Sequence, residues 1–143
     1  LSLWKLAIKP GKPLAFGEVA GTPIFGLPGN PVSAWITFAL MAKPWLIRRQ
    51  GGSTEPLPRF PVQADFQKPR PGNREEFLRV RLSGSGTAMR ATLTGSQSSG
   101  VLSSVSEADG VAVIPPNTTL TRGDWVEVIP LWALLSPVFA QAY

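Results

Sequence analysis

The stretch IFGLPGNPVSA, residues 24–34, joins a strand-like segment to a long apolar segment. Its glycines and prolines break regular structure, so the strand must end within it. Asn30 is a favoured N-cap residue, and Pro31 fits the first position of a helix. The stretch therefore predicts a strand, a tight turn and then a helix over residues 31–49.

The chain on both sides of this stretch completes one structural unit. Arg48 and Arg49 suit the negative end of the helix dipole, and the Gly-Gly pair that follows ends the helix. Pro44 is expected to kink it. Strands followed by a tight turn and a helix indicate the last part of an α/β domain, which we assign to residues 1–52. The expected strands are residues 3–8, 14–19 and 22–27.

The second half of the chain has a different pattern. Residues 53–58 are rich in Ser and Pro and predict a linker, after which short strand-like segments alternate with Gly-rich turns. A small all-β barrel or sandwich is expected over residues 59–131, which makes the fold class α+β. The apolar tail, residues 132–143, either packs on the barrel or is exposed. The expected strands are residues 60–66, 76–83, 88–94, 110–115 and 124–131.

Two details of this β region bear on its surface. Phe77, Arg79 and Arg81 alternate with apolar residues, which predicts a half-buried strand with one polar face. The Arg-Gly-Asp triplet at residues 122–124 falls where a hairpin turn is expected. An adhesion role for the triplet is disfavoured because no secretion signal accompanies it.

Composition narrows the classes of chemistry. The 143 residues include neither Cys nor His, which excludes disulfides, thiol nucleophiles, imidazole bases and the usual zinc ligands. The net charge of +5 favours anionic partners. Nucleic acid is not expected as a partner because Lys and Arg do not cluster with aromatic residues. The longest apolar run is too short for a membrane span, and the lack of Cys fits a cytoplasmic protein.

The residues suggest an oxyanion site. Lys9 and Lys12 flank a Pro-Gly turn that directs two ammonium groups toward one dianion, and a solvated turn is the alternative. The turn before the helix offers backbone N–H groups and the Ser33 hydroxyl. Its alternative role is ordinary capping by Asn30 and Ser33.

Two further segments supply oxyanion donors. Arg74 offers a planar fork for an oxyanion, or else pairs with Glu75 or Glu76 at the surface. The serine-rich segment over residues 95–110, which includes Ser99, offers hydroxyl donors, or else is a polar loop. No two carboxylates show a spacing typical of metal ligands.

Taken together, these motifs resemble those of a known family. IKPGKPLAFGEVAGTPIFGLPGNPVSAWITF, residues 8–38, is similar to the end of the central α/β domain of MoeA-type molybdopterin molybdenumtransferases, which include the E domain of gephyrin. The second half resembles the C-terminal β-barrel domain of that family, on the motifs GNREEFLRV, QSSGVLSSVSEADGVAVIP and GDWVEV. The resemblance covers residues 1–131.

The resemblance implies a fold and an activity. Residues 1–52 become the C-terminal part of a MoaB/MogA-like, molybdopterin-binding α/β domain, and residues 59–131 become the β-barrel domain. The family inserts molybdate into adenylylated molybdopterin, releases AMP and uses Mg²⁺. The implied partners are adenylylated molybdopterin and molybdate, in a cytoplasmic homodimer.

The motif match also implies roles for single residues. Lys9 and Lys12 correspond to the basic turn of the active site and are assigned catalytic roles. The implied ligands of the substrate or molybdate are Pro10, Asn30, Ser33, Arg74 and Ser99. The acidic metal ligands of the family lie in segments that precede the matched part, so no metal ligand is assigned in this chain.

Two other functions stay open at this point. One is a non-catalytic interaction module of the gephyrin type, and the other is a generic domain that binds phosphate ligands. We also expect this chain to be the C-terminal part of a longer protein. The helix over residues 31–49 should then leave several large side chains partly exposed, namely Trp35, Phe38, Trp45 and Leu46.

We predict that this chain by itself does not catalyse the hydrolysis of adenylylated molybdopterin, because the carboxylates that hold Mg²⁺ in the family are not assigned to it. The measurement is the release of AMP from adenylylated molybdopterin in the presence of molybdate and Mg²⁺. Molybdate-dependent release of AMP by this chain would contradict the prediction.

Overall fold

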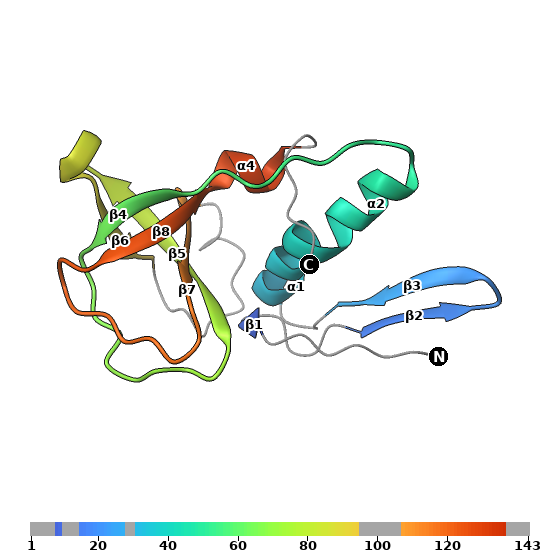
Figure 1. Ribbon diagram of the computed structural model, residues 1–143, viewed down its shortest axis with the longest axis horizontal. Coiled ribbons are helices and arrows are strands. Elements are labelled where there is room, and N and C mark those ends of the chain that lie inside the picture. Colours follow the sequence, from blue (N-terminus) through green and yellow to red (C-terminus); the bar gives the residue numbers. More distant parts are fainter. Residues whose placement is uncertain (1–7, 10–14, 28–30, 95–106, 137–143) are drawn as a thin grey trace.

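A closed β-barrel forms the second half of the molecule (Figure 1). The computed structural model describes residues 8–9, 15–27, 31–94 and 107–136. The barrel strands follow the order β5-β6-β4-β8-β7, and pairing between β5 and β7 closes the ring. This confirms the predicted barrel and rules out the sandwich. The strands are β4 (Phe60–Ala64), β5 (Glu75–Ser83), β6 (Arg90–Leu93), β7 (Gly110–Ile114) and β8 (Trp125–Pro130), and a 3₁₀ turn, η2 (Gly86–Ala88), joins β5 to β6.

Small and branched apolar side chains fill the barrel. Val62, Val80, Ala91, Ala112 and Val128 are all fully buried, and they come from all five strands. Alternate residues of a strand point to opposite faces, so each strand contributes every second side chain to this core. The small side chains suit the narrow interior of a five-stranded barrel.

Two short β elements precede the barrel. β1 (Ile8–Lys9) pairs in parallel with the start of β5, and most of the strand expected at residues 3–8 lies outside the described residues. β2 (Ala15–Val19) and β3 (Thr22–Gly26) correspond to two of the predicted strands, and they pair as an antiparallel hairpin. The positive φ angles of Ala20 and Gly21, 50° and 79°, are those of a tight hairpin turn whose twist matches the strands.

The predicted helix is present over its whole length, with a widened middle. It consists of α1 (Pro31–Thr37), a π-helical segment η1 (Phe38–Ala42) and α2 (Lys43–Arg49). The N–H of Lys43 donates to Phe38 O, five residues earlier. Pro44 has no N–H and its ring crowds the carbonyl of residue 40, so the wider turn relieves the clash. The predicted kink therefore takes the form of a π segment.

The helix ends where the Gly-Gly pair predicts. Gly51 has a φ of 84°, and its N–H donates to Arg48 O. The N–H of Gly52 donates to Ile47 O. These two hydrogen bonds form a Schellman motif, in which the left-handed backbone favours glycine at position 51.

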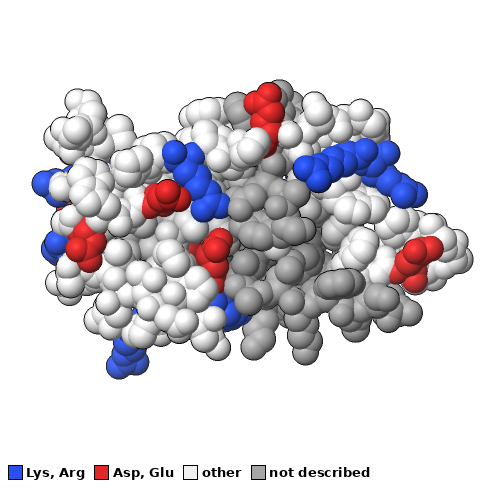
Figure 2. Space-filling view, viewed as in Figure 1, with Lys and Arg blue, Asp and Glu red and all other residues white. Residues whose placement is uncertain are grey.

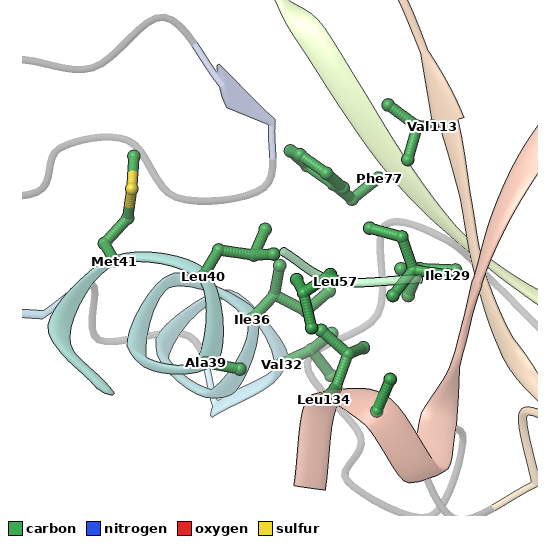
Figure 3. Close-up of a cluster of buried hydrophobic side chains, with 12 residues drawn as sticks. Val32, Ile36, Ala39, Leu40, Met41, Leu57, Phe77, Val113, Ile129 and Leu134 are labelled. Atoms are coloured by element: carbon green, nitrogen blue, oxygen red, sulfur yellow. The ribbon is translucent and has the colours of Figure 1, made fainter. Parts of the chain in front are cut away.

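A second apolar core joins the helix to the outer face of the barrel (Figure 3). Ile36 and Leu40 of the helix lie in one buried cluster with Phe77 of β5 and Ile129 of β8. The division into two domains stays a prediction, and this shared cluster packs the segment before the linker against the segment after it. Trp35 and Trp45 are half-buried, and Phe38 and Leu46 are exposed, as expected.

The start of the tail packs against this second core. α4 (Leu131–Leu135) buries Ala133 and Leu134 in the cluster, and residues 137–143 lie outside the described residues. The Nζ of Lys43 donates hydrogen bonds to Leu134 O at 2.6 Å and to Ser136 O at 2.9 Å. These contacts satisfy two carbonyls at the end of α4 and fix the tail to the helix.

We predict that Lys43→Met destabilises the protein by about 1–3 kcal/mol, because it leaves two carbonyls without their donor. Urea unfolding followed by circular dichroism measures the change. Lys43→Arg keeps a donor and should cost less, and equal stability of Lys43→Met and wild type would contradict the prediction.

Lys43 also gives an alkaline signature. Burial lowers its pKa below the usual 10.5, so the folded state releases the proton more readily than the unfolded chain. Between the lowered pKa and 10.5, the stability of the wild type should therefore rise with pH relative to Lys43→Met.

Candidate functional site

The pairing of β1 with β5 brings two predicted site segments together. Lys9 is the register partner of Glu76, and Ile8 that of Glu75. Arg74 directly precedes Glu75 in the chain. The parallel register therefore places Lys9 beside the second residue of β5, which follows Arg74 by two residues in the chain.

A third cation beside β5 is already neutralised. Lys68 lies 3.4 Å from the carboxylate of Glu76, and their side chains are 14% and 9% exposed. The Lys68 Nζ also donates to Arg70 O at 2.7 Å. Lys68 is therefore held by the protein itself and is not a candidate ligand of an oxyanion.

β5 carries a buried arginine that the sequence pattern did not indicate. Arg79 is 1% exposed and Phe77 is also 1% exposed, so the predicted polar face is wrong at both positions. Burial lowers the pKa of Arg79, and an arginine still keeps its proton in a protein. Phe77 could have indicated that Arg79 is buried, because residues two apart in a strand share a face and a phenylalanine marks that face as apolar. Arg81 follows the expectation, since it is exposed and lies 3.6 Å from Glu107.

The same strand fastens both ends of the serine-rich segment. Before the segment, the N–H of Thr94 donates to Arg79 O at 3.1 Å. After it, the N–H of Asp109 donates to Val80 O, and Asp109 Oδ2 accepts from the N–H of Leu82. The described residues on either side of positions 95–106 are thus hydrogen-bonded to the middle of β5.

Several predicted site residues lie outside the described residues, namely Pro10, Lys12, Asn30 and Ser99. Ser33 is half-buried in the first turn of α1. Its neighbour Val32 belongs to the same buried cluster as Phe77, the residue after Glu76. The roles of all seven site residues stay predictions.

A separate cleft of about 280 Å³ opens on the barrel where β7 and β8 diverge. Glu75, Glu127 and Arg59 line it together with the exposed Trp125. Two carboxylates disfavour an oxyanion there, and Arg59 lies 3.8 Å from Glu127. The charges that line the cleft therefore disfavour an anion there.

The Arg-Gly-Asp triplet has structural partners. Arg122 donates to the backbone carbonyl and the carboxylate of Asp65 at 2.8 Å and 2.6 Å. The carboxylate of Asp124 accepts from the N–H and the hydroxyl of Thr121. Both charged side chains of the triplet thus stabilise the turn before β8.

The described surface offers neither a broad basic field nor a metal cluster. Figure 2 shows basic and acidic side chains interspersed over the barrel on the visible face. Within residues 8–9, 15–27, 31–94 and 107–136, no three Asp or Glu side chains gather closely enough to hold a metal ion. Across the same ranges, no helix has the length and apolar character needed to cross a lipid bilayer.

Comparison with known sequences identifies relatives of both halves. The family model described as "MoeA C-terminal region (domain IV)" matches residues 61–131. Molybdopterin molybdenumtransferase from Haemophilus influenzae is 51% identical over 51 residues, which are 36% of this chain and 13% of that protein. Molybdopterin molybdenumtransferase 1 from Mycobacterium tuberculosis is 34% identical over 134 residues, 87% of this chain and 31% of that protein.

Relatives also include a fly protein and solved structures. Molybdenum cofactor synthesis protein cinnamon from Drosophila melanogaster is 34% identical over 120 residues, 80% of this chain and 19% of that protein. A crystal structure of the molybdopterin biosynthesis MoeA protein from Pyrococcus horikoshii OT3 matches with a TM-score of 0.70 at 25% identity, over 91% of this chain and 33% of that one. The chain thus spans about a third or less of each of these relatives.

We predict that Arg79→Ala destabilises the protein by about 2–5 kcal/mol, because it leaves a cavity at a fully buried position. Arg81→Ala, two residues along the same strand, is the matched control and should change stability by about 0.5 kcal/mol or less. Urea unfolding measures both variants. Equal effects of the two substitutions would contradict the burial of Arg79.

Proposed function

The chain belongs to the MoeA family, and we propose that it forms one wall of an oxyanion site that binds molybdate for insertion into adenylylated molybdopterin. The observation that carries the proposal is the pairing of β1 with β5, which places Lys9 in register with Glu76, two residues after Arg74 in the chain. The longer relatives named molybdopterin molybdenumtransferases give the reaction class, a transfer of molybdenum.

Each proposed ligand suits a tetrahedral oxyanion. Lys9 and Lys12 attract the dianion as point charges, and Arg74 donates from its planar fork. Ser33, Ser99 and Asn30 are proposed as neutral donors, and Pro10 shapes the basic turn. In this proposal the chain binds and orients the oxyanion and balances its charge. The two dithiolene sulfurs bind molybdenum while one oxo ligand leaves as water with the two thiol protons.

The described residues do not fit the Mg²⁺ that the family uses. Mg²⁺ prefers carboxylate and other oxygen ligands in an octahedral arrangement. Glu76 is paired with Lys68, and Glu75 faces the cleft beside Glu127. Glu75 and Glu76 are therefore not proposed as ligands of Mg²⁺.

We further propose that residues 1–52 are the C-terminal part of a MoaB/MogA-like α/β domain in a cytoplasmic homodimer. The hairpin and helix of this segment expose several large apolar side chains, as a segment covered in a larger assembly does. These residues are Val19, Ile24, Leu27, Phe38 and Leu46. A peptide-binding module of the gephyrin type and a generic phosphate-binding domain are the competing functions.

We predict that Arg74→Gln and Lys12→Gln each weaken molybdate binding about tenfold, because each removes a charge-assisted donor. Arg90→Gln is the matched control, since Arg90 is exposed on β6 and has no proposed contact with the oxyanion. Isothermal titration calorimetry with molybdate measures the affinities.

Competition among anions separates the functions. A molybdate site should bind molybdate more tightly than sulfate or phosphate. Equally weak binding of all three anions would instead favour the generic phosphate-binding domain. Unchanged molybdate affinity in Lys12→Gln would support the alternative interpretation, in which Lys12 belongs to a solvated turn that does not bind the anion.

A further inference from the structure

A buried ion pair lies directly behind the proposed oxyanion site. Glu76 is 7% exposed, and its Oε1 lies 3.4 Å from the Nζ of Lys68. Burying a charge is costly unless it is paired and hydrogen-bonded. Lys68 meets this requirement twice, because its Nζ also donates to Arg70 O. The pair therefore has a defined geometry, unlike an exposed ion pair.

This pair belongs to a loop that is fastened at several points. The loop over residues 65–74 leads from β4 to Arg74. Lys68 exchanges two backbone hydrogen bonds with Leu120, at 2.9 Å and 3.0 Å. Nearer to Arg74, Gly72 O accepts from the N–H of Asn117 at 2.7 Å. The backbone of Lys68 is thus held by Leu120. Its side chain contacts the carbonyl of Arg70 and the carboxylate of Glu76, which lies two residues after Arg74 in the chain.

Gly72 shows how closely the loop approaches the pair. A Cβ on Gly72 would overlap Glu76 Oε1. The φ of Gly72 is not in the left-handed region, so a larger residue would be accommodated there only if the Glu76 carboxylate moved. The carboxylate of Glu76 thus packs against the backbone two residues before Arg74.

Glu76 also connects the loop to β1. It is the register partner of Lys9, so its backbone takes part in the β1–β5 pairing while its side chain holds Lys68. One residue therefore joins the strand that carries Lys9 to the loop that carries Arg74. We propose that the Lys68–Glu76 ion pair is a positioning device that sets the spacing between Lys9 and Arg74 and so tunes oxyanion affinity, although neither residue of the pair touches the oxyanion.

This inference rests on the proposed function, and charge removal tests it by the sign of the effect. If the pair positions Arg74, Glu76→Gln and Lys68→Met should both lower the molybdate affinity of the 143-residue chain, by on the order of tenfold. If Lys68 instead attracts the anion directly, Lys68→Met should lower the affinity and Glu76→Gln should raise it, because a nearby carboxylate repels an anion. A higher affinity in Glu76→Gln would therefore overturn the proposal.

Three further variants separate positioning from loss of fold. Gly72→Ala keeps both charges but displaces the Glu76 carboxylate, and it should also lower the affinity. Lys68→Arg restores a cation and should retain most of the affinity. Glu127→Gln removes the same charge from an exposed pair on β8 and should leave the affinity unchanged. Far-ultraviolet circular dichroism checks that each variant is folded.

NMR can test the positioning of Arg74 even if the protein binds no anion. The side-chain Nε–H resonance of Arg74 should shift in Glu76→Gln and Gly72→Ala but not in Glu127→Gln. If the wild type binds neither molybdate nor sulfate, the proposed function fails, and this resonance still tests the positioning. An unchanged Arg74 resonance in both Glu76→Gln and Gly72→Ala would overturn the inference by itself.

Discussion

The rest of the structure depends on β5, which has to bury both of its faces. Its inward residue Val80 lies in the barrel core, and its outward residue Phe77 lies in the core shared with the helix. The same strand pairs with β1, β6 and β7, so it closes the barrel and carries the N-terminal β1 on its edge. A strand buried on both faces cannot slip by one residue without exposing one of its apolar sets. The register of β5 is therefore fixed.

Because its register is fixed, β5 can hold the segments of a binding site at defined positions. Arg74 precedes its first residue, Lys9 is registered against its second, and the serine-rich segment is tied to its middle. Segments that lie far apart in the sequence thus take their positions from one rigid element. Rigid strands hold binding groups more reproducibly than loops do, and oxyanion recognition needs such groups at set distances. Glu76 and Arg79 are the charged residues that β5 itself buries.

Sequence patterns predicted the elements well where a local signal decided them. The Gly-Gly pair after Arg49 ended the helix, and Pro44 distorted it, because φ preference and a missing N–H act within one or two turns. The alternation in β5 was interpreted wrongly at Arg79, because burial on the outer face depends on what packs there. The sequence also left open whether the tail packs on the barrel. Lys43, 91 residues earlier than Leu134, helps to fix its first turn.

The sequence by itself determined the two strands before the helix, the long helix, the all-β second half and the basic character of the proposed site. These properties follow from backbone preferences, periodicity and residue type, which act over a few neighbouring positions. Only the tertiary structure decided that the helix covers the barrel, that Arg79 is buried, and that Lys9 lies in register with the residues after Arg74. Those outcomes depend on contacts between distant segments, whose free energy is gained only when the whole chain has folded.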